Sequence, residues 1–453
     1  MASINRISDD AVVIYVSLGH DMKGNRIRKS KKFFRPSNMT DKKWEKEIQK
    51  LAVDFERDLN SNYSLNAQIT LKEYSKKWLS EYGNINLEDT TLDSYKRELR
   101  TKILPALGHL KIGLITPIHI VSFLNNLLED GVRVDGKPGS YSDKTIKYQW
   151  QILSSLLQQA VYWQILENNP CKSVKVPKNK KDMSDYTEKV IEFYDEDQTI
   201  LLIDIINNEV TNHKIALEGY KSGSKAYNNL NHSNPLKYKA ALYIALFSGL
   251  RNGEILGLTW NDIDFDNKTL SVKRVRAVTK EHGMITKYPK SKSSVRTLSV
   301  PDSVLDVLLE HKEEQDKERN ILLNIWDKEW DKTPWIFTQW DGKGMYYQTL
   351  SKWLKKVVRK HNNAIMEDEN IPDKDKANYL LPVLSIHKLR HTSATLLIGQ
   401  NTDIRTVSAR LGHAQTSTTM DIYVHGLKSI DRKASDTLEE LLDKSKRKLR
   451  VVK

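Results

Sequence analysis

The chain has 453 residues, more than one ordinary hydrophobic core holds, so roughly two to four domains are expected. Its 72 lysines and arginines outnumber its 58 aspartates and glutamates, which gives a formal net charge of +14 and a pI near 9.3. This balance favours a polyanionic partner, because each cation set on a phosphate releases counterions; a basic protein without such a partner is the simpler alternative. The single cysteine, Cys171, excludes a disulfide within the chain and a cysteine-rich zinc site.

Neither a signal segment nor a membrane span is indicated. The first residues, M-A-S-I-N-R, lack an apolar region, and the chain nowhere reaches the roughly 18 consecutive apolar residues that a spanning helix needs. We therefore expect a soluble, cytoplasmic protein, with Cys171 as a small packing residue.

Residues 1–62 predict a small unit made of a hairpin and a helix. A β-rich run from Ala11 to Leu18 is followed by a turn at Gly24 and a second strand from Arg26 to Phe34, and the helical pattern then runs from Asp41 to about Asn60. The second strand is strongly basic; its cations are Arg26, Arg28, Lys29, Lys31 and Lys32. They indicate either a ribbon that enters the major groove of DNA or an edge strand protected by its lysines.

Residues 66–175 predict a second, all-helical unit. Helical patterns run from Thr70 to Leu79, from Thr90 to a stop at Pro105, from Pro117 onward with Thr116 as cap, and from Ser142 to Trp163. Lys144 and Lys147 on the last helix are candidates for phosphate contacts, although a single surface lysine is more often simply solvated.

Residues 185–453 predict a third unit. Asn207 to Lys237 indicates an extended loop or extra helices, and Ala240 to Leu258 has a helix-like apolar face that carries Arg251. Thr269 to Val275 and Ser294 to Pro301 alternate like strands on either side of a lysine-rich segment. After Ser435, a leucine stripe predicts a C-terminal tail helix.

Five residues of this third unit carry a chemical pattern. Arg251 lies in L-F-S-G-L-R-N-G-E, His387 and Arg390 in L-S-I-H-K-L-R-H-T, His413 in L-G-H, and Tyr423 ten residues later in M-D-I-Y-V-H. A guanidinium offers a planar fork for phosphoryl oxygens, and a histidine transfers protons near neutral pH. A phenol needs a base or a cationic field before it attacks, because its free pKa is about 10. The motif lacks the carboxylate or cysteine spacing of a zinc site, so no metal is expected.

This order of residues resembles the active site of the tyrosine recombinase (phage integrase) family, and the chain is most similar to integrases of phages and Gram-positive conjugative transposons. The resemblance implies a multidomain, mainly α protein with small β elements. It has an arm-type DNA-binding domain (1–62), a helical, SAM-like core-binding domain (66–175) and a mixed, mainly helical catalytic domain (185–453).

The resemblance also implies the chemistry. Tyr423 would be the nucleophile that leaves a 3′-phosphotyrosine, with Arg251, His387, Arg390 and His413 at the phosphate and no cofactor. I-T-K-Y-P-K-S-K-S-S resembles the family's lysine hairpin, with Lys290 as the general acid and Lys292 as the alternative. The implied partners are double-stranded core and arm sites, a homo-tetramer on DNA, and accessory DNA-bending or directionality proteins.

Two alternatives stay open. The same chemistry without exchange between mobile sites describes a resolvase or a type IB topoisomerase-like enzyme. A DNA-binding regulator on this fold without catalysis is the other alternative, and the complete set of site residues counts against it.

Overall fold

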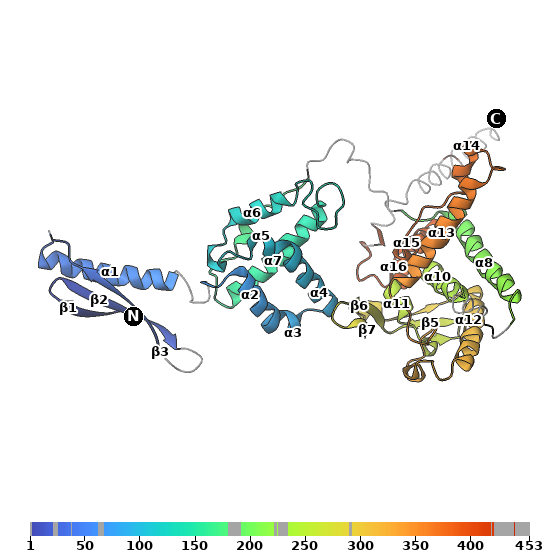
Figure 1. Ribbon diagram of the computed structural model, residues 1–453, viewed down its shortest axis with the longest axis horizontal. Coiled ribbons are helices and arrows are strands. Elements are labelled where there is room, and N and C mark those ends of the chain that lie inside the picture. Colours follow the sequence, from blue (N-terminus) through green and yellow to red (C-terminus); the bar gives the residue numbers. More distant parts are fainter. Residues whose placement is uncertain are drawn as a thin grey trace, which may run out of the picture. The chain divides into compact units, whose positions relative to one another are not determined.

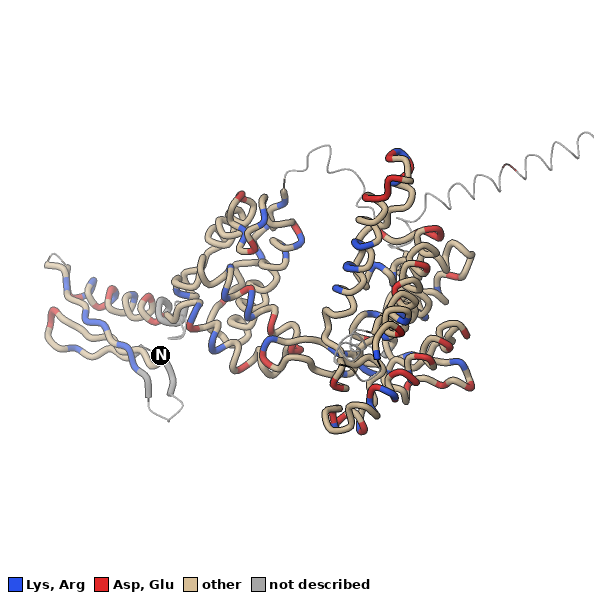
Figure 2. The backbone as a smooth tube through the Cα atoms, turned by 45° about the vertical axis from the view of Figure 1, so that its right-hand side comes forward, with Lys and Arg blue, Asp and Glu red and all other residues tan. Residues whose placement is uncertain are grey.

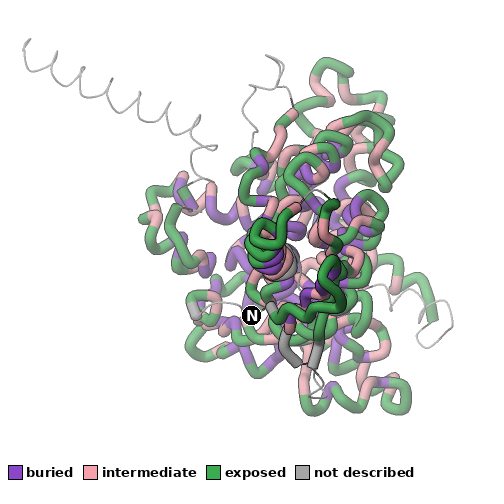
Figure 3. Tube along the Cα trace, turned by 90° about the vertical axis from the view of Figure 1, so that its left-hand side faces the viewer, coloured by how far each residue is buried: buried purple, intermediate pink, exposed green. Residues whose placement is uncertain are grey.

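The computed structural model describes residues 2–20, 26–37, 39–61, 68–179, 192–221, 224, 234–289, 292–417, 419–420 and 439. Its contacts divide the chain into two compact units, Met1–Tyr186 and Thr187–Lys453. Buried positions gather inside these units and exposed positions surround them (Figure 3). Within the described ranges, no helix combines the length and apolar character needed to cross a bilayer.

The first unit begins with a three-stranded antiparallel sheet and a helix (Figure 1). Strands β1 (Ala2–Ser8), β2 (Ala11–His20) and β3 (Arg26–Phe34) are arranged in that order, and α1 (Asp41–Ser61) follows. The hairpin β2–β3 and the helix are as predicted, whereas β1 was missed. Its described side chains are exposed and its apolar residues do not alternate, so it is held mainly by backbone pairing to β2.

One face of this sheet packs against α1. Val12, Ile14 and Val16 are almost fully buried, and Val12 and Ile14 lie with Trp44 and Ile48 in a small core. Because these three valine and isoleucine positions alternate along β2, they leave the opposite face of the sheet free of the helix.

A helical bundle forms the rest of the first unit. Its helices are α2 (Leu71–Trp78), α3 (Asn84–Asn86), α4 (Asp89–Glu98), α5 (Leu104–Leu107), α6 (Pro117–Asn126) and α7 (Asp143–Tyr162). Thr116 caps α6 as the sequence predicts, and Thr70 and Ser142, where two further helical patterns begin, cap α2 and α7. Cys171 is fully buried as expected, and burial raises the pKa of its thiol to about 12.

The predicted stop at Pro105 is wrong. A π-helical turn, Leu99–Ile103, follows α4, and Pro105 lies at the second position of α5. Proline removes one backbone donor and clashes with the preceding turn of a regular α-helix. The wider π-helical turn changes the hydrogen-bond spacing just before the proline, and the helix continues to Leu107.

The second unit is built around α10 (Leu236–Ser248), whose side chains are buried on nearly all sides. Helices α8 (Glu196–Glu218), α12 (Asp302–Ile321), α13 (Thr349–Glu367) and α15 (Ile386–Gly399) contact it. The shorter helices are α11 (Asn252–Leu256), α14 (Asp373–Lys376) and α16 (Ile404–Leu411). A helix that is apolar all round needs such a surrounding layer.

The described residues of this unit also form two small antiparallel sheets. The first has the order β4 (Ile263–Asp264), β5 (Thr269–Val272) and β8 (Arg296–Ser299), and the second pairs β6 (Val275–Thr279) with β7 (Gly283–Lys287). The predicted strand pair corresponds to β5 and β8, but the hairpin β6–β7 between them was missed.

Two further expectations need correction. The first part of the segment 207–237 is neither a loop nor an extra element, because α8 runs through it to Glu218. Arg251 does not lie within a helix: α10 ends at Ser248, and Arg251 is the extended residue that precedes α11. Gly249, with a φ of +64°, makes this break possible.

Candidate active site

Arg251 is fixed by the helix that it precedes. Its backbone N–H donates to Glu254 Oε2 at 3.0 Å, and its Nη1 donates to Glu254 Oε1 at 2.8 Å. The Arg251 side chain remains 38% exposed, whereas that of Glu254 is 1% exposed. The guanidinium is therefore held at one edge and open to solvent elsewhere.

Glu254 is shared with a second arginine. Arg296, at the start of β8, donates from Nη2 to Glu254 Oε2 at 3.0 Å, and its side chain is only 8% exposed. Burial by itself raises the pKa of Glu254, but the hydrogen bond and charge of Arg296, followed by those of Arg251, outweigh it and the pKa is lowered. The carboxylate thus stays ionised between two guanidinium groups.

Arg390 lies on α15 and is almost completely buried. Its Nη1 donates to the carbonyl of Gly249 at 2.7 Å and its Nη2 to that of Leu411 at 2.6 Å. Burial and then the charge of Arg251 lower its pKa to about 9, which still leaves it charged at neutral pH. Among the described residues, no carboxylate forms an ion pair with it, so its charge is available to an anion.

The three arginines meet at the carboxyl end of α16. Arg296 Nε donates to the carbonyl of Arg410 at 2.7 Å, Arg390 to that of Leu411, and Arg251 Nη2 to that of Gly412 at 3.4 Å. The last carbonyls of a helix lack partners within the helix and carry its negative dipole end, so they suit cations. Three positive charges and the one negative charge of Glu254 leave an excess of two, which suits a phosphate.

Three histidines lie around this cluster. His413 follows the αL residue Gly412, and its Nδ1 lies 2.8 Å from the hydroxyl of Thr419. Burial, and then Arg390 and Arg251, lower its pKa to about 4. His387, in the first turn of α15, also has a lowered pKa, because of partial burial and the charges of Arg390 and Arg251. Both rings are therefore neutral at pH 7.

His391 follows His387 by one turn of α15. Its ring meets that of His387 edge to face, with centroids 4.9 Å apart, and burial lowers its pKa to about 4. Its contact with His387 places it beside the predicted site residues.

The structure thus brings Arg251, Arg390 and His413 into one cluster, with His387 within electrostatic reach. Tyr423, Lys290 and the tail helix after Ser435 lie outside the described residues, as does the side chain of Lys292. Sequence reasoning missed Arg296. The only available signal was an arginine at the start of a predicted strand, which does not distinguish it from other strand arginines.

The basic strand β3 separates its cations onto two faces. Residues opposite each other in an antiparallel pair point to the same side. Lys29 and Lys31 pair with Val16 and Ile14, on the side of α1, whereas Arg28 and Lys32 pair with Ser17 and Val13 on the open face. Figure 2 marks the cations of this strand in blue. The side chain of Arg26 is outside the described residues.

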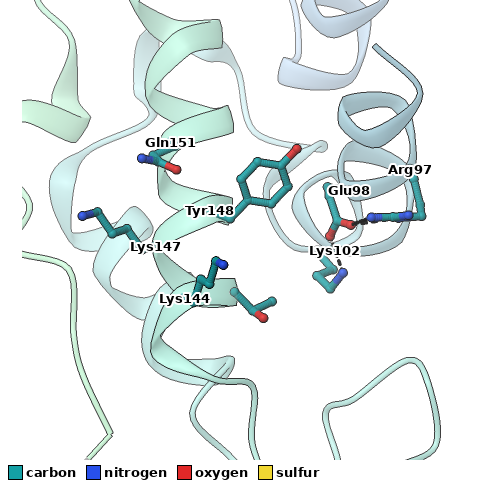
Figure 4. A pocket seen from close by; sticks show the side chains of 8 residues that line it. Arg97, Glu98, Lys102, Lys144, Lys147, Tyr148 and Gln151 are labelled. Atoms are coloured by element: carbon teal, nitrogen blue, oxygen red, sulfur yellow. Dashed lines mark hydrogen bonds and ion pairs between the residues drawn. The ribbon is translucent and has the colours of Figure 1, made fainter. Parts of the chain in front are cut away.

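Lys144 and Lys147 line a cavity of about 510 Å³ in the helical bundle (Figure 4). Its other lining residues are Arg97, Glu98, Lys102, Thr145, Tyr148 and Gln151. Burial by itself raises the pKa of Glu98, but hydrogen bonds from Lys102, Arg97 and Gln149 outweigh it and lower the pKa. Arg97 and Lys102 thus already have a counterion. In the described part of the chain, no carboxylate forms an ion pair with Lys144 or Lys147, and both side chains are exposed.

A second basic surface was not predicted. Along α13 a hollow of about 620 Å³ is lined by Lys352, Lys356, Arg359, Lys360, Asn363, Ala364 and Glu367. Lys360 pairs with Glu209 at 2.5 Å. Among the described residues, no group of three or more His, Cys, Asp or Glu side chains is arranged to hold a metal ion.

Comparison with known proteins gives this site its context. The phage integrase family matches residues 222–429, and the N-terminal SAM-like domain of phage integrases matches residues 70–128. Together the two matches span more than half of the chain, which belongs to the phage integrase (tyrosine recombinase) family. Members of this family are DNA strand-exchange enzymes, and this chain is a site-specific recombinase of that kind.

Individual relatives agree with this assignment. A tyrosine recombinase XerC-like protein of Caldanaerobacter subterraneus subsp. tengcongensis is 27% identical over 439 residues, 94% of this chain and 95% of that protein. The ICEBs1 integrase of Bacillus subtilis is 26% identical over 73% of this chain and 72% of that protein. The solved structure of the Tn1549 transposon integrase, in complex with transposon right end DNA, shares the fold. Its TM-score is 0.57 at 19% identity, over 82% of this chain and 100% of that one.

Proposed function

We propose that Arg251 and Arg390 hold the scissile phosphate of a DNA recombination site while Tyr423 attacks it. The attack leaves a 3′-phosphotyrosine and a free 5′-hydroxyl, and a 5′-hydroxyl from the partner duplex then reverses the step. The observation that carries this proposal is the gathering of three guanidinium groups on the consecutive carbonyls of residues 410–412. Fixed cations of this kind stabilise the charge that develops on the phosphoryl oxygens in the transition state.

The histidines complete the proposed chemistry. A neutral His387 accepts the proton of the tyrosine hydroxyl, since its lowered pKa keeps it unprotonated at neutral pH. If the hydroxyl of Thr419 donates to Nδ1 of His413, the ring proton remains on Nε2. His413 then donates to a non-bridging phosphoryl oxygen.

The leaving 5′-oxygen requires a proton, for which we propose Lys290, with Lys292 as the alternative. The described hairpin β6–β7 ends at Lys287, only three residues before Lys290. Because the phosphotyrosine conserves the energy of the broken bond, the cycle needs neither ATP nor a metal ion.

We further propose that DNA contacts are divided among three domains, 1–62, 66–175 and 185–453. The open face of the N-terminal sheet, with Arg28 and Lys32, suits the major groove of an arm site. Lys144 and Lys147 suit the backbone of the core site, because they lack carboxylate partners among the described residues and line an open cavity. That the solved Tn1549 integrase is bound to DNA supports a DNA partner here.

The assembly is proposed from the requirements of strand exchange. Exchange between two duplexes requires four active sites, so the active form would be a homo-tetramer on DNA, acting in the cytoplasm with accessory DNA-bending or directionality proteins. The tail helix after Ser435 would link neighbouring protomers.

The direct test uses a core-site duplex nicked close to the cleavage position, so that the cut strand diffuses away and the covalent adduct accumulates. The wild type should form an adduct that survives denaturing electrophoresis, and Tyr423→Phe should bind the DNA but form none. Tyr379→Phe is the matched control, because Tyr379 is an exposed tyrosine of the same unit. An adduct that persists in Tyr423→Phe overturns the assignment.

A further inference from the structure

We infer that Arg296 is a positioning residue for strand cleavage. Its buried guanidinium ties the carboxylate of Glu254 to the carboxyl end of α16, and this tie holds Arg251 toward the phosphate. The inference rests on the proposed role of Arg251, and it adds a residue that the pattern of catalytic residues did not identify.

Every nitrogen of the Arg296 guanidinium is committed within the protein. Its Nε donates to the carbonyl of Arg410 at 2.7 Å, and its Nη1 donates to that of Ser294 at 3.0 Å. Nη1 and Nη2 also reach the two oxygens of Glu254, at 3.3 and 3.0 Å. With these bonds and 8% exposure, Arg296 has no free fork for DNA, in contrast to Arg251.

The shared carboxylate explains why two arginines are needed. A lone Glu254–Arg251 pair would offset the charge of Arg251 and weaken its field at the phosphate. Since Arg296 supplies a second positive charge to the same carboxylate, Glu254 can orient Arg251 through Oε1 while the cluster keeps its excess of positive charge. The bond from the Arg251 backbone to Oε2 also fixes where α11 begins.

The structure leaves room for this arrangement at one particular glycine. Gly412 has a φ of +66°, and a Cβ there would lie 2.9 Å from Arg296 Nη1 and 3.1 Å from its Cζ. A side chain at 412 would therefore displace the guanidinium and strain the turn that leads to His413. Arg296 also begins β8, the strand that follows the segment with Lys290 and Lys292, so the same anchor fixes one end of that segment.

The contact between Arg296 and Glu254 predicts an effect of pH on cleavage that a purely packing role of Arg296 does not predict. The charged groups that face Glu254 are Arg251 before α11, Arg296 on β8 and, through its charge, Arg390 on α15. Without Arg296, burial dominates and the pKa of Glu254 rises, so a growing fraction is protonated as the pH falls. A protonated Glu254 no longer accepts both hydrogen bonds from Arg251.

The experiment measures single-turnover cleavage of the nicked core site by the full chain at saturating DNA, between pH 6 and pH 9, alongside DNA affinity by gel shift. We expect Arg296→Met to cut about tenfold to a hundredfold more slowly at neutral pH, as a displaced catalytic group does, with DNA affinity unchanged. Its rate should rise with pH relative to wild type. Adding Glu254→Gln should abolish that rise, and Arg296→Lys should recover part of the rate.

Arg274→Met is the matched control, because Arg274 pairs with Asp262, another buried carboxylate of the same unit, and not with Glu254. It should leave the rate and its pH profile unchanged. If Arg296→Met does not melt cooperatively, Arg296→Lys carries the test, since it keeps the charge and loses the fork. A flat profile in Arg296→Met, a full wild-type rate in Arg296→Lys, or slowing that merely matches a loss of DNA affinity overturns the inference. An absent Tyr423 adduct in the wild type would instead overturn the proposed function.

Discussion

The arginine cluster of the catalytic unit and the basic strand β3 of the N-terminal sheet use positive charge in opposite ways. Arg390 and Arg296 are buried and each makes at least two hydrogen bonds to protein oxygens, whereas Arg28, Lys29, Lys31 and Lys32 are exposed. A buried guanidinium with fixed partners needs no reorganisation when charge develops on a substrate. An exposed lysine keeps its side-chain freedom and is screened by salt.

This difference indicates which step each region controls. The cluster can act on the rate of cleavage because its field is strong and pre-oriented. The strand can act on affinity, which for phosphate contacts depends steeply on salt because counterions are released. Substitutions in the cluster should therefore change the rate of cleavage, and substitutions in the strand should change the affinity for DNA.

The largest effect is expected at the two arginines proposed to hold the phosphate. Arg251→Ala and Arg390→Ala should slow cleavage by roughly a hundredfold or more, because a fixed charge on the transition state is removed. Single-turnover cleavage of the nicked duplex measures this. Arg359→Ala, which removes an exposed cation from α13 in the same unit, should cut at the wild-type rate. Equal slowing of all three variants would mean that only overall charge matters.

The next effect concerns the proton for the leaving group. Lys290→Ala should cut a normal duplex slowly and should recover on a substrate with sulfur at the 5′-bridging position, since a thiolate leaves without a proton. Lys292→Ala is the paired control and should gain nothing from the sulfur. Recovery in Lys292→Ala instead would move the general acid by two residues.

A smaller effect, on the affinity for an arm site, is expected from substitutions on the two faces of β3. Arg28→Ala with Lys32→Ala should weaken binding to an arm site and reduce the salt dependence by about one ion for each phosphate that is no longer neutralised. Lys29→Ala with Lys31→Ala removes the same charge from the side of α1. This pair should have a smaller effect on the affinity for the arm site and on its salt dependence. Fluorescence anisotropy titrations at several salt concentrations measure this. Equal weakening by the two pairs would show that only the charge of the strand matters, and not its open face.

The smallest effect is expected in the cavity of the helical bundle. Lys144→Ala with Lys147→Ala should lower affinity for the core site several-fold without changing the cleavage rate of bound DNA, because phosphate contacts position the duplex. Lys172→Ala removes one exposed lysine of the same unit and should change affinity less. A slower cleavage rate at saturating DNA in the double variant would place these lysines in the chemistry instead.

Much of the site could be predicted because its residues lie in short motifs with fixed spacing. His387 and Arg390 are one turn apart, so a single helix, α15, presents both. The helices of the bundle could also be predicted from apolar periodicity and, for α6, from the cap Thr116.

What the sequence did not reveal depends on contacts between distant residues. Arg296 is 42 residues from Glu254 and 114 from Arg410, and nothing local marks it as their partner. β1 forms mainly because β2 has a free edge, and the helical path that begins with α4 continues through Pro105 in α5 only by way of a π-helical turn. Local propensity also suggested that the helix continues through Arg251, whereas the αL residue Gly249 ends it.

The most direct test of the account replaces one non-bridging oxygen of the scissile phosphate with a methyl group, which removes its negative charge. If Arg251 acts by neutralising that charge, the deficit of Arg251→Ala relative to wild type should shrink by about tenfold or more on this methylphosphonate duplex, out of the roughly hundredfold expected on the normal phosphate. The measurement is the single-turnover rate of adduct formation for both proteins on both substrates. An undiminished deficit on the neutral substrate would contradict the claim that the arginine cluster works through its charge.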